Sequence, residues 1–479
     1  MFQGSGPIVT DWCLTLDDNE GITMHRSFPT RRSVLHGSAI ALAGGFWVRC
    51  APAVESRSPN ERLNFAHIGV GGQGSSDFGV SAGHNVVAIC DVDDRELKRR
   101  AERVGGDVAS FHDYRKMYDK MMNRIDAVVI ATPDHQHALA SLMAIRNGKH
   151  VYTEKPLAHS VHECFLLGAE AKKPNVKTQM GNAAHPDYQF RRAKELIDAG
   201  LIGKVTEVHV NNVRASATKW PAGLTTALRE SDPPDAKPPI PSYLDWDLWL
   251  GGADERDYHP DYCPKRWRGW RDFGTGGIGD FFCHHADPAF TCLDLTHPVS
   301  IEAAGSSKPI PSDRAPGGTF RFMFAARGDQ PAVTLYWHGG GSGPPAEIVD
   351  VDAKDPILDG LNCLMIGDKG AMAVGRGNGQ ADPVLFPRAR FRDVKLPPTT
   401  LGSVVGHKQQ LAHCVRHGGL PGSNFQERAS YLSACALLGH VAYWSGQKIE
   451  WDGPNLRVTN VPDANRFIRK SYRKGWEVA

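Results

Sequence analysis

The sequence predicts an α/β protein with two domains: an N-terminal doubly wound parallel sheet and a C-terminal α+β domain with a large mixed, mainly antiparallel sheet. Three observations predict it: a glycine-rich string directly after an apolar run, apolar segments that alternate with single amphipathic helices up to about residue 180, and short alternating apolar segments beyond residue 300. With 479 residues, 41% of them hydrophobic, the chain is long enough to bury two cores.

The glycine-rich string IGVGGQGSSD at 68–77 is the first functional signal. The apolar run from Leu63 to Gly69 predicts a buried strand, and a helix is expected from Ser75 onward. A strand, a G-x-G-x-x-G turn and a helix together are typical of a Rossmann dinucleotide-binding unit. In such a unit Gly69 permits the tight turn, Gly71 lets the main chain approach a pyrophosphate, and Gly74 lets helix and strand pack closely. An ordinary glycine-rich loop at a strand end is the alternative.

An acidic residue at the end of the second strand supports the dinucleotide interpretation. Asn85 to Cys90 is a second apolar run, and Asp91 follows it about 20 residues after the glycines. Its carboxylate is expected to accept hydrogen bonds from the adenosine ribose and to repel a 2′-phosphate, which favours NAD over NADP.

The next hundred residues continue the alternation of helix and strand. A parallel sheet gathers its ligands at the carboxyl ends of its strands, so the residues that follow each predicted strand are candidate cleft residues. These are Thr132, Pro133, Asp134 and Glu154-Lys155-Pro156. The predicted helices span Asp93 to Val104, Asp113 to Met122 and Asp134 to Asn147, and the predicted strands span Ile125 to Ala131 and His150 to Tyr152.

Two further motifs carry polar side chains suited to alcohol oxidation. Glu154-Lys155-Pro156 places a lysine at a strand end, and GTGGIGDFFCHHADP at 274–288 places Asp280 and His284 four residues apart, on one face of a helix. A carboxylate beside an imidazole forms an oriented base, which helps remove the hydroxyl proton as hydride leaves. A structural ion pair is the alternative reading of each motif.

With these motifs the sequence resembles the family of glucose-fructose oxidoreductase, inositol dehydrogenase and MocA, the Gfo/Idh/MocA oxidoreductases. The resemblance covers almost the whole chain after the N-terminal segment, including LDWDLWLGGADERDYHPDYCPKRWRGW at 244–270, similar to a secreted bacterial branch, and GSNF at 422–425. It implies that Lys155 lies beside the nicotinamide, and it matches Asp280 and His284 to the family's D-x-x-x-H pattern. His284 is then the expected general base, Asp280 an orienting or substrate-binding group, and Lys155 a hydroxyl contact and proton relay. One departure concerns pocket shape: Phe281 and Phe282 stand where that branch more often has small residues.

The complete set of predicted site residues follows from the motifs and the resemblance together. The predicted cofactor-binding residues are Gly69, Gly71, Gly72, Gln73, Gly74, Asp91, Thr132, Pro133, His137, Glu154 and Lys155. The predicted substrate contacts are Tyr262, Trp267, Arg268 and His285, although aromatic residues more often serve in core packing than as sugar platforms.

Composition argues against several other classes of protein. The formal net charge of +2 gives no reason to expect a nucleic-acid partner. The ten cysteines form no C-x-x-C pair, so neither a disulfide framework nor a zinc ribbon is predicted. Asp280, Cys283, His284, His285, His259 and Cys263 lie close in sequence but fit no standard zinc spacing, and no metal is expected.

The N-terminal segment predicts export rather than a membrane span. Arg31 and Arg32 precede an apolar run at 38–48 that is too short to cross a bilayer, and Ala51-Pro52-Ala53 offers a cleavage site after Ala53. We therefore expect a twin-arginine signal peptide over residues 24–53, starting at Met24 because the preceding residues are acidic, and a periplasmic protein. A disordered cytoplasmic tail with two chance arginines is the alternative.

The domain boundaries follow from these elements. The NAD-binding Rossmann domain is expected over residues 61–182 and the substrate-binding and oligomerisation domain over 183–479. In the second domain a helix is predicted over Phe190 to Ala199, and strands over Val205 to Asn211, Thr319 to Ala325, Ala332 to Trp337 and Ala371 to Val374, with a proline-rich surface loop from Pro221 to Pro241. The resemblance implies a homodimer or homotetramer formed through the open face of this sheet.

Three functions remain open at this point. The first is an NAD-dependent dehydrogenase of a sugar, cyclitol or sugar derivative, which travels through the twin-arginine pathway folded and with its NAD tightly bound. The second is a glycoside hydrolase or lyase that acts by transient oxidation and elimination; one such branch lacks the EKP lysine, so Lys155 favours net redox chemistry. The third is a non-catalytic sugar-binding protein.

Overall fold

The computed structural model describes residues 62–182, 188–211, 237–264, 266–304, 318–339, 362–375, 382–402 and 404–477. The predicted signal peptide, with Arg31, Arg32 and its cleavage site, lies outside these ranges, as does the greater part of the proline-rich segment Pro221 to Pro241. Within the described ranges no helix combines the length and the apolar character needed to cross a membrane.

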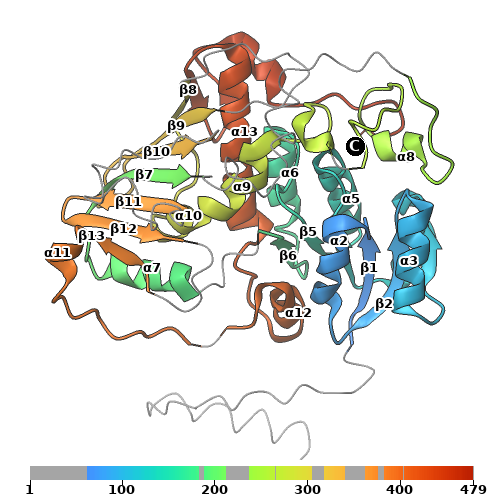
Figure 1. The fold of residues 1–479 in the computed structure, drawn as a ribbon, viewed down its shortest axis with the longest axis horizontal. Coiled ribbons are helices and arrows are strands. Elements are labelled where there is room, and N and C mark those ends of the chain that lie inside the picture. The colour runs from blue at the N-terminus through green and yellow to red at the C-terminus, as the bar shows by residue number, and fades with distance from the viewer. Residues whose placement is uncertain are drawn as a thin grey trace, which may run out of the picture. The chain divides into compact units, whose positions relative to one another are not determined.

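The N-terminal domain is built on a six-stranded parallel sheet, as predicted (Figure 1). Its strand order is β3-β2-β1-β4-β5-β6, so the order reverses between β1 and β4, where a doubly wound sheet binds its ligand. The strands are β1 (Asn64–Ile68), β2 (Asn85–Cys90), β3 (Ala109–Phe111), β4 (Ala127–Ile130), β5 (His150–Thr153) and β6 (Thr178–Met180).

The helices of this domain begin at polar caps that the sequence provides. The side chains of Asp93, Asp113 and Ser160 each accept a hydrogen bond from a backbone N–H of the first turn, which satisfies donors that a helix start leaves unpaired. The helices are α2 (Gly72–Asp77), α3 (Asp94–Val104), α4 (Tyr114–Met121), α5 (Asp134–Arg146) and α6 (Val161–Glu170), with 3-10 turns η2 (Phe78–Ser81) and η3 (Met122–Arg124).

One helix start differs from the prediction. We expected the helix after the glycine-rich turn to begin at Ser75, but α2 begins at Gly72. Glycine has a low helix propensity, so a prediction from propensity places the boundary after the last glycine. The first turn of a helix tolerates glycine here because the position is set by the close packing of the turn against the sheet rather than by propensity.

The C-terminal domain contains a nine-stranded mixed sheet in which the pairing of β7 with β10 is parallel and the other described pairings are antiparallel. This confirms the predicted mixed, mainly antiparallel architecture. In order across the sheet the strands are β13 (Val384–Phe386), β12 (Gly370–Val374), β11 (Cys363–Gly367), β7 (Val205–Asn211), β10 (Val333–His338), β9 (Thr319–Phe324), β8 (Ser300–Ala304), β14 (Ile449–Asp452) and β15 (Arg457–Val458).

Helices cover one face of this sheet and join it to the N-terminal domain (Figure 1). The strand residues on that face are apolar and alternate with polar ones, as in β9, where Phe320, Phe322 and Phe324 are buried. Helix α13 (Ser430–Ser445) packs against α6, α9 and β8 and therefore contacts both domains. The other helical segments are α7 (Tyr188–Asp198), α8 (Trp246–Leu250), η7 (Trp267–Gly269), α9 (Gly276–His285), α10 (Asp287–Cys292), α11 (Arg388–Phe391), α12 (His407–His417), the π-helical turn η10 (Phe425–Ala429) and η11 (Pro462–Phe467).

The packing of the glycine-rich turn generates a test. A Cβ atom on Gly74 would lie 1.9 Å from the carbonyl oxygen of Gly69, so Gly74→Ala forces the turn and α2 apart. We expect the free energy of unfolding to fall by about 3 kcal/mol, because overpacking against backbone cannot be relieved by a side-chain movement. Gly277→Ala is the matched control, since a Cβ there meets nothing within 4 Å, and it should change stability by about 1 kcal/mol at most. Urea unfolding of both variants measures this; equal losses would contradict the close approach.

Candidate active site

The candidate site lies where the carboxyl ends of the central parallel strands meet. The glycine-rich turn follows β1, Thr132 and Pro133 follow β4, and Glu154 and Lys155 follow β5. These strands are neighbours in the sheet, so residues distant in sequence converge at one edge.

The glycine-rich turn has the geometry that a dinucleotide requires. Gly69 has φ +78°, and a Cβ on it would lie 2.6 Å from the carbonyl oxygen of Ala131 in the neighbouring turn. A Cβ on Gly72 would meet nothing within 4 Å, so the backbone is open on that side. Gly71 is the N-cap of α2 and leaves the first backbone N–H groups of the helix available to an anion. The loop therefore fits a pyrophosphate.

Asp91 has a second role that the sequence did not indicate. Its Oδ2 accepts hydrogen bonds from the backbone N–H of Val70 at 2.8 Å and of Gly71 at 3.3 Å, and its Oδ1 accepts one from Asp93 at 3.0 Å. Burial raises the pKa of Asp91, while these three N–H groups favour its ionised form. The carboxylate thus braces the glycine-rich turn from the end of β2, the position predicted for a ribose contact.

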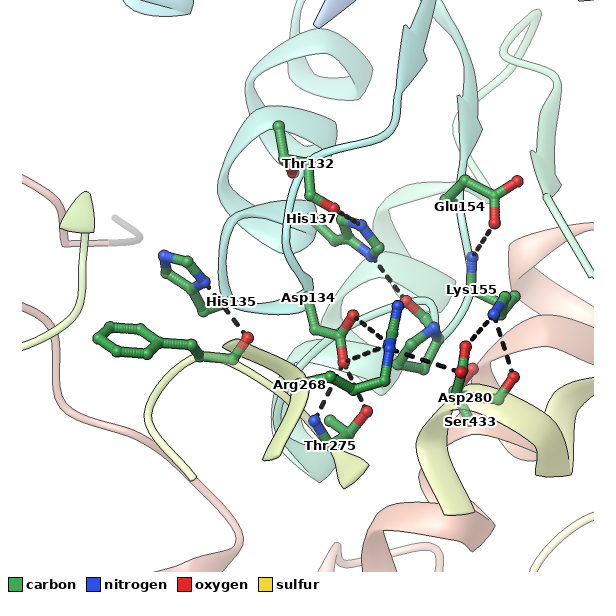
Figure 2. A network of polar contacts seen from close by, with 12 residues as sticks. Thr132, Asp134, His135, His137, Glu154, Lys155, Arg268, Thr275, Asp280 and Ser433 are labelled. Atoms are coloured by element: carbon green, nitrogen blue, oxygen red, sulfur yellow. Dashed lines mark hydrogen bonds and ion pairs between the residues drawn. The ribbon is translucent and has the colours of Figure 1, made fainter. Parts of the chain in front are cut away.

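His137 joins the turns that follow β4 and β5. Its Nδ1 lies 2.7 Å from the carbonyl oxygen of Pro156 and its Nε2 lies 2.8 Å from that of Thr132 (Figure 2). Both ring nitrogens are therefore occupied by main-chain groups. The hydroxyl of Thr132, just after β4, is buried and has no hydrogen-bond partner among the described residues.

Lys155 and Asp280 meet across the two domains. The Lys155 ammonium forms an ion pair with the Asp280 carboxylate and donates a second hydrogen bond to the Asp280 backbone oxygen at 3.1 Å. In Figure 2 the lysine side chain, from the turn after β5, points at Asp280 on α9. Both side chains are largely buried, with exposed fractions of 14% and 8%. Two motifs 125 residues apart therefore form one charged pair.

Arg268 completes a chain of buried charges. Its Nη1 donates to Asp134 Oδ1 at 3.1 Å and its Nε lies 3.5 Å from Asp280 Oδ2, so the guanidinium lies between the two carboxylates (Figure 2). Asp134 also accepts hydrogen bonds from the backbone N–H of Thr275 at 3.1 Å and from its hydroxyl at 2.6 Å. This fixes the start of α9 on the start of α5.

The surrounding charges decide the ionisation of Asp280. Burial alone would raise its pKa, but the positive charges of Arg268 and Lys155 outweigh burial and lower it below its ordinary value. The lowered pKa favours the ionised form of Asp280.

His284 lies one helical turn beyond Asp280 and is held by a residue that the sequence reading did not select. Its Nδ1 donates to the backbone oxygen of Asn182, so in the neutral ring Nε2 carries the lone pair. Asn182 is fully buried, and its amide donates to the Cys283 backbone oxygen and to Asp287, both at 3.1 Å. Asn182 is the second residue after β6. The rule that ligands gather at strand ends could therefore have identified it.

Two family models match this chain, and both belong to the same group of enzymes. Residues 63–182 match the oxidoreductase family with the NAD-binding Rossmann fold, and residues 187–321 match the C-terminal alpha/beta domain of that family. The chain belongs to the Gfo/Idh/MocA family of oxidoreductases. Its N-terminal domain is accordingly an NAD-binding domain.

Individual relatives show how far the likeness extends. A glycosyl hydrolase family 109 protein of Solibacter usitatus is 28% identical over 194 residues, 37% of this chain and 44% of that protein. An inositol 2-dehydrogenase of Rubrobacter xylanophilus is 34% identical over 154 residues, 31% of this chain and 43% of that protein. The chain thus aligns with less than half the length of these curated relatives. The WlbA dehydrogenase of Bordetella pertussis, solved with NADH and UDP-GlcNAcA, shares the fold with a TM-score of 0.52 at 16% identity, over 81% of this chain and 98% of that one.

The predicted substrate contacts of this Gfo/Idh/MocA protein do not all contact the charged network. Arg268 belongs to the charged network, and its guanidinium also stacks on Trp267, with 4.3 Å between the carbon Cζ and the ring centre. His285 lies beside Phe281, with 5.7 Å between ring centres. Tyr262 packs instead into a buried aromatic cluster against Trp270 and Phe273, and no contact between Tyr262 and the charged network occurs among the described residues. The structure therefore gives Tyr262 a packing role.

The bulky pair at 281–282 divides between site and core. Phe282 is fully buried against Phe290, Phe322 and Trp337. Phe281 is partly exposed beside His285 and is therefore the member of the pair that affects pocket shape.

The described part of the chain contains neither a disulfide bond nor a cluster of side chains suited to hold a metal ion. All eight described cysteines are buried and unpaired. Among those residues no group of three or more histidine, cysteine and acidic side chains has the geometry of a metal site.

Glu154 forms a buried acid pair that sequence reasoning missed. Its carboxyl group lies beside that of Asp77 at the end of α2; Asp77 is fully buried and Glu154 is 6% exposed. Gln73 donates to Asp77 Oδ1 at 3.1 Å, and the ammonium of Lys408, from α12, lies 3.2 Å from the same oxygen. Burial and the neighbouring Asp77 raise the pKa of Glu154 well above its ordinary value, so the two carboxyl groups share one proton.

The shared proton has a consequence for stability. A raised pKa means that the folded protein holds a proton which the unfolded chain releases above the ordinary glutamate value near 4.5, so stability falls as pH rises through that window. Glu154→Gln replaces the protonated acid with a neutral amide and should remove a few kcal/mol of this loss between about pH 5 and about pH 8. Chemical unfolding at several pH values measures it, and Glu102→Gln, an exposed glutamate on α3, is the control. An unchanged pH slope in Glu154→Gln would contradict the shared proton.

Proposed function

We propose that this protein is an NAD-dependent oxidoreductase that transfers hydride between a secondary alcohol of a sugar, cyclitol or sugar derivative and a tightly bound nicotinamide cofactor. One observation carries the proposal: Lys155 from the Rossmann domain and Asp280 and His284 from the second domain converge at the carboxyl edge of the parallel sheet. An amine, an acid and an imidazole so placed are the groups that alcohol oxidation needs.

The residues that would hold NAD are those of the strand ends. The turn from Gly69 to Gly74 would hold the pyrophosphate, Asp91 would accept hydrogen bonds from the ribose, and Thr132, Pro133 and Glu154 would contact the nicotinamide half. When bound, NAD supplies the hydride acceptor. His137 positions this site through its contacts with the carbonyl oxygens of Thr132 and Pro156.

The protein's own residues manage the proton of the substrate hydroxyl. Because Asn182 accepts the Nδ1 proton of His284, Nε2 is the nitrogen that takes the hydroxyl proton. Lys155 donates a hydrogen bond to the substrate oxygen as negative charge develops there. Asp280 and Arg268 hold the lysine in place, which limits the reorganisation needed during the reaction.

A second function is favoured by one relative. The Solibacter usitatus protein is a glycosyl hydrolase family 109 protein, which supports cleavage of a glycoside by transient oxidation and elimination as the alternative. Lys155, present here and held by Asp280, favours net oxidation. A non-catalytic sugar-binding protein is the third candidate, and the buried charged network argues against it, because binding alone does not require such costly burial.

We also propose a homodimer or homotetramer that forms through the face of the nine-stranded sheet opposite the helices. That face carries a stack of aromatic rings, in which His209 lies 5.0 Å from Tyr336 and 5.1 Å from His338 between ring centres. Light scattering of wild type and Tyr336→Arg tests the interface, and a wild-type monomer would refute it.

Export by the twin-arginine pathway to the periplasm is part of the proposal, and it favours tight cofactor binding because that pathway moves folded proteins. Protein purified from the periplasm without added nucleotide should carry NAD(H), which denaturation and mass spectrometry detect. Replacing Arg31 and Arg32 with lysine should leave the protein in the cytoplasm. Periplasmic protein free of nucleotide would contradict the tight binding.

The catalytic assignment is tested by His284→Asn and Lys155→Met. Each should lower kcat by about a hundred-fold to ten-thousand-fold, the range for loss of a proton-transfer group, while NAD binding is largely kept. His413→Asn is the matched control for the histidine, because His413 is exposed on α12 and belongs to none of the predicted site residues, and it should retain most of the activity. The measurement is nicotinamide absorbance with a panel of sugars and inositols.

The same panel separates the candidate functions. Net oxidation changes nicotinamide absorbance and gives a product two hydrogens lighter. If a glycoside panel releases an alcohol without a net change in nicotinamide absorbance, the hydrolase replaces the dehydrogenase proposal. If wild type turns over no substrate and Lys155→Met binds sugar as well as wild type does, the binding protein replaces both.

A further inference from the structure

A cavity of about 590 Å³ lies outside the residues of the catalytic cluster. It is bordered by the C-terminal end of α13, by η11 with the tail that follows it, and by loop residues around 253 and 271. Its charged lining residues are Asp254, Arg271, Asp272, Arg466, Arg469 and Lys470. Neither Lys155, Asp280 nor His284 is among them.

The charge of this lining is unbalanced. Four cationic side chains and two acidic ones border the cavity, and one of the acids, Asp272, is already paired with Arg256 outside it. Lys470 lies 3.5 Å from Glu163. Arg466 and Arg469 are exposed and form no ion pair within the described ranges. The cavity lining therefore carries more cationic than acidic side chains.

Aromatic rings hold the arginines in fixed orientations. The Cζ atom of Arg271 lies over Trp444, 4.1 Å from the centre of its ring, and 5.2 Å from the ring centre of Phe467. The Cζ atom of Arg466 lies 4.7 Å from the same Phe467 ring centre. A stacked guanidinium keeps its N–H edge free to donate in its own plane. Burial lowers the pKa of Arg271, the negative charge of Asp272 opposes this, and the positive charge of Arg466 adds a smaller lowering. The two cations repel each other, and a bound anion would relieve that repulsion.

A buried histidine nitrogen adds an unsatisfied polar group to the same wall. His159 lines the cavity, and its Nδ1 is buried without a hydrogen-bond partner in the described part of the chain. The ring also interacts with backbone groups of Gly274 and Arg271, which hold it in place. Buried polar atoms without partners are rare in folded proteins, so this nitrogen also indicates a missing ligand.

We propose that this cavity binds a small molecule through a phosphate or sulfate group, at a site separate from the catalytic centre. Planar guanidinium groups donate in pairs to such tetrahedral oxyanions, and Arg466, Arg469 and Arg271 supply three of them. The volume exceeds that of one such group and lies in the range of small-molecule sites, so it admits either the free anion or its sugar ester. The proposal does not depend on which of the candidate reactions the enzyme performs.

The test is calorimetric titration of protein saturated with NAD, so that the glycine-rich turn is not available to the probe. Inorganic phosphate and inorganic sulfate are titrated at constant ionic strength, and glucose 6-phosphate is compared with glucose. We expect wild type to bind the anions and the double variant Arg466→Gln/Arg469→Gln to bind them at least about tenfold more weakly, since each charge-assisted hydrogen bond lost has roughly that effect. Stronger binding of glucose 6-phosphate than of phosphate identifies an ester as the ligand, and equal binding identifies the free anion.

The controls separate this site from others. Arg390→Gln removes an exposed arginine elsewhere and should bind phosphate as wild type does. His284→Asn should also bind phosphate normally, because the catalytic cluster is not involved. Arg271→Lys keeps the charge without the planar fork and should weaken binding by a smaller factor. Absence of binding to wild type, equal binding to the double variant, or loss of binding in His284→Asn would each overturn the proposal.

Discussion

The candidate site depends on a chain of four largely buried charges that joins the two domains. Lys155 and Asp134 come from the Rossmann domain, and Asp280 and Arg268 come from the second domain. Removing charges from water is costly, and only close partners of opposite sign recover that cost. Each domain alone would leave a buried acid or base unpaired. The network is therefore satisfied only in one arrangement of the domains, which is also the arrangement that places His284 at the strand ends.

Much of this arrangement could be predicted from local sequence. The roles of Gly69 and Gly74 follow from a turn whose geometry only glycine adopts, and the shared face of Asp280 and His284 follows from helical spacing. The resemblance then joined Lys155 to them. The doubly wound sheet followed from the alternation of strands and helices, which is likewise a short-range pattern.

The parts that escaped prediction all involve partners distant in the chain. Asp134 was recognised as a cleft residue, but its bond to Arg268 joins residues 134 positions apart and leaves no periodic trace. The same holds for Asn182 with His284 and for Asp77 with Glu154. Tyr262 was a predicted substrate contact with core packing as the alternative, and only the tertiary structure shows its packing against Trp270 and Phe273. Tertiary contacts, not spacing, set these roles.

Two neighbouring carboxyl groups of the site are driven to opposite states by their surroundings. Asp280 lies between two cations and stays ionised, whereas Glu154 lies beside another acid and holds a proton. Environments that separate pKa values in this way assign different roles to residues of the same chemistry. In the proposed mechanism the Asp280 carboxylate orients Lys155 as a hydrogen-bond donor to the substrate oxygen. In that mechanism Nε2 of His284 accepts the substrate proton, because Nδ1 donates a hydrogen bond to the backbone oxygen of Asn182.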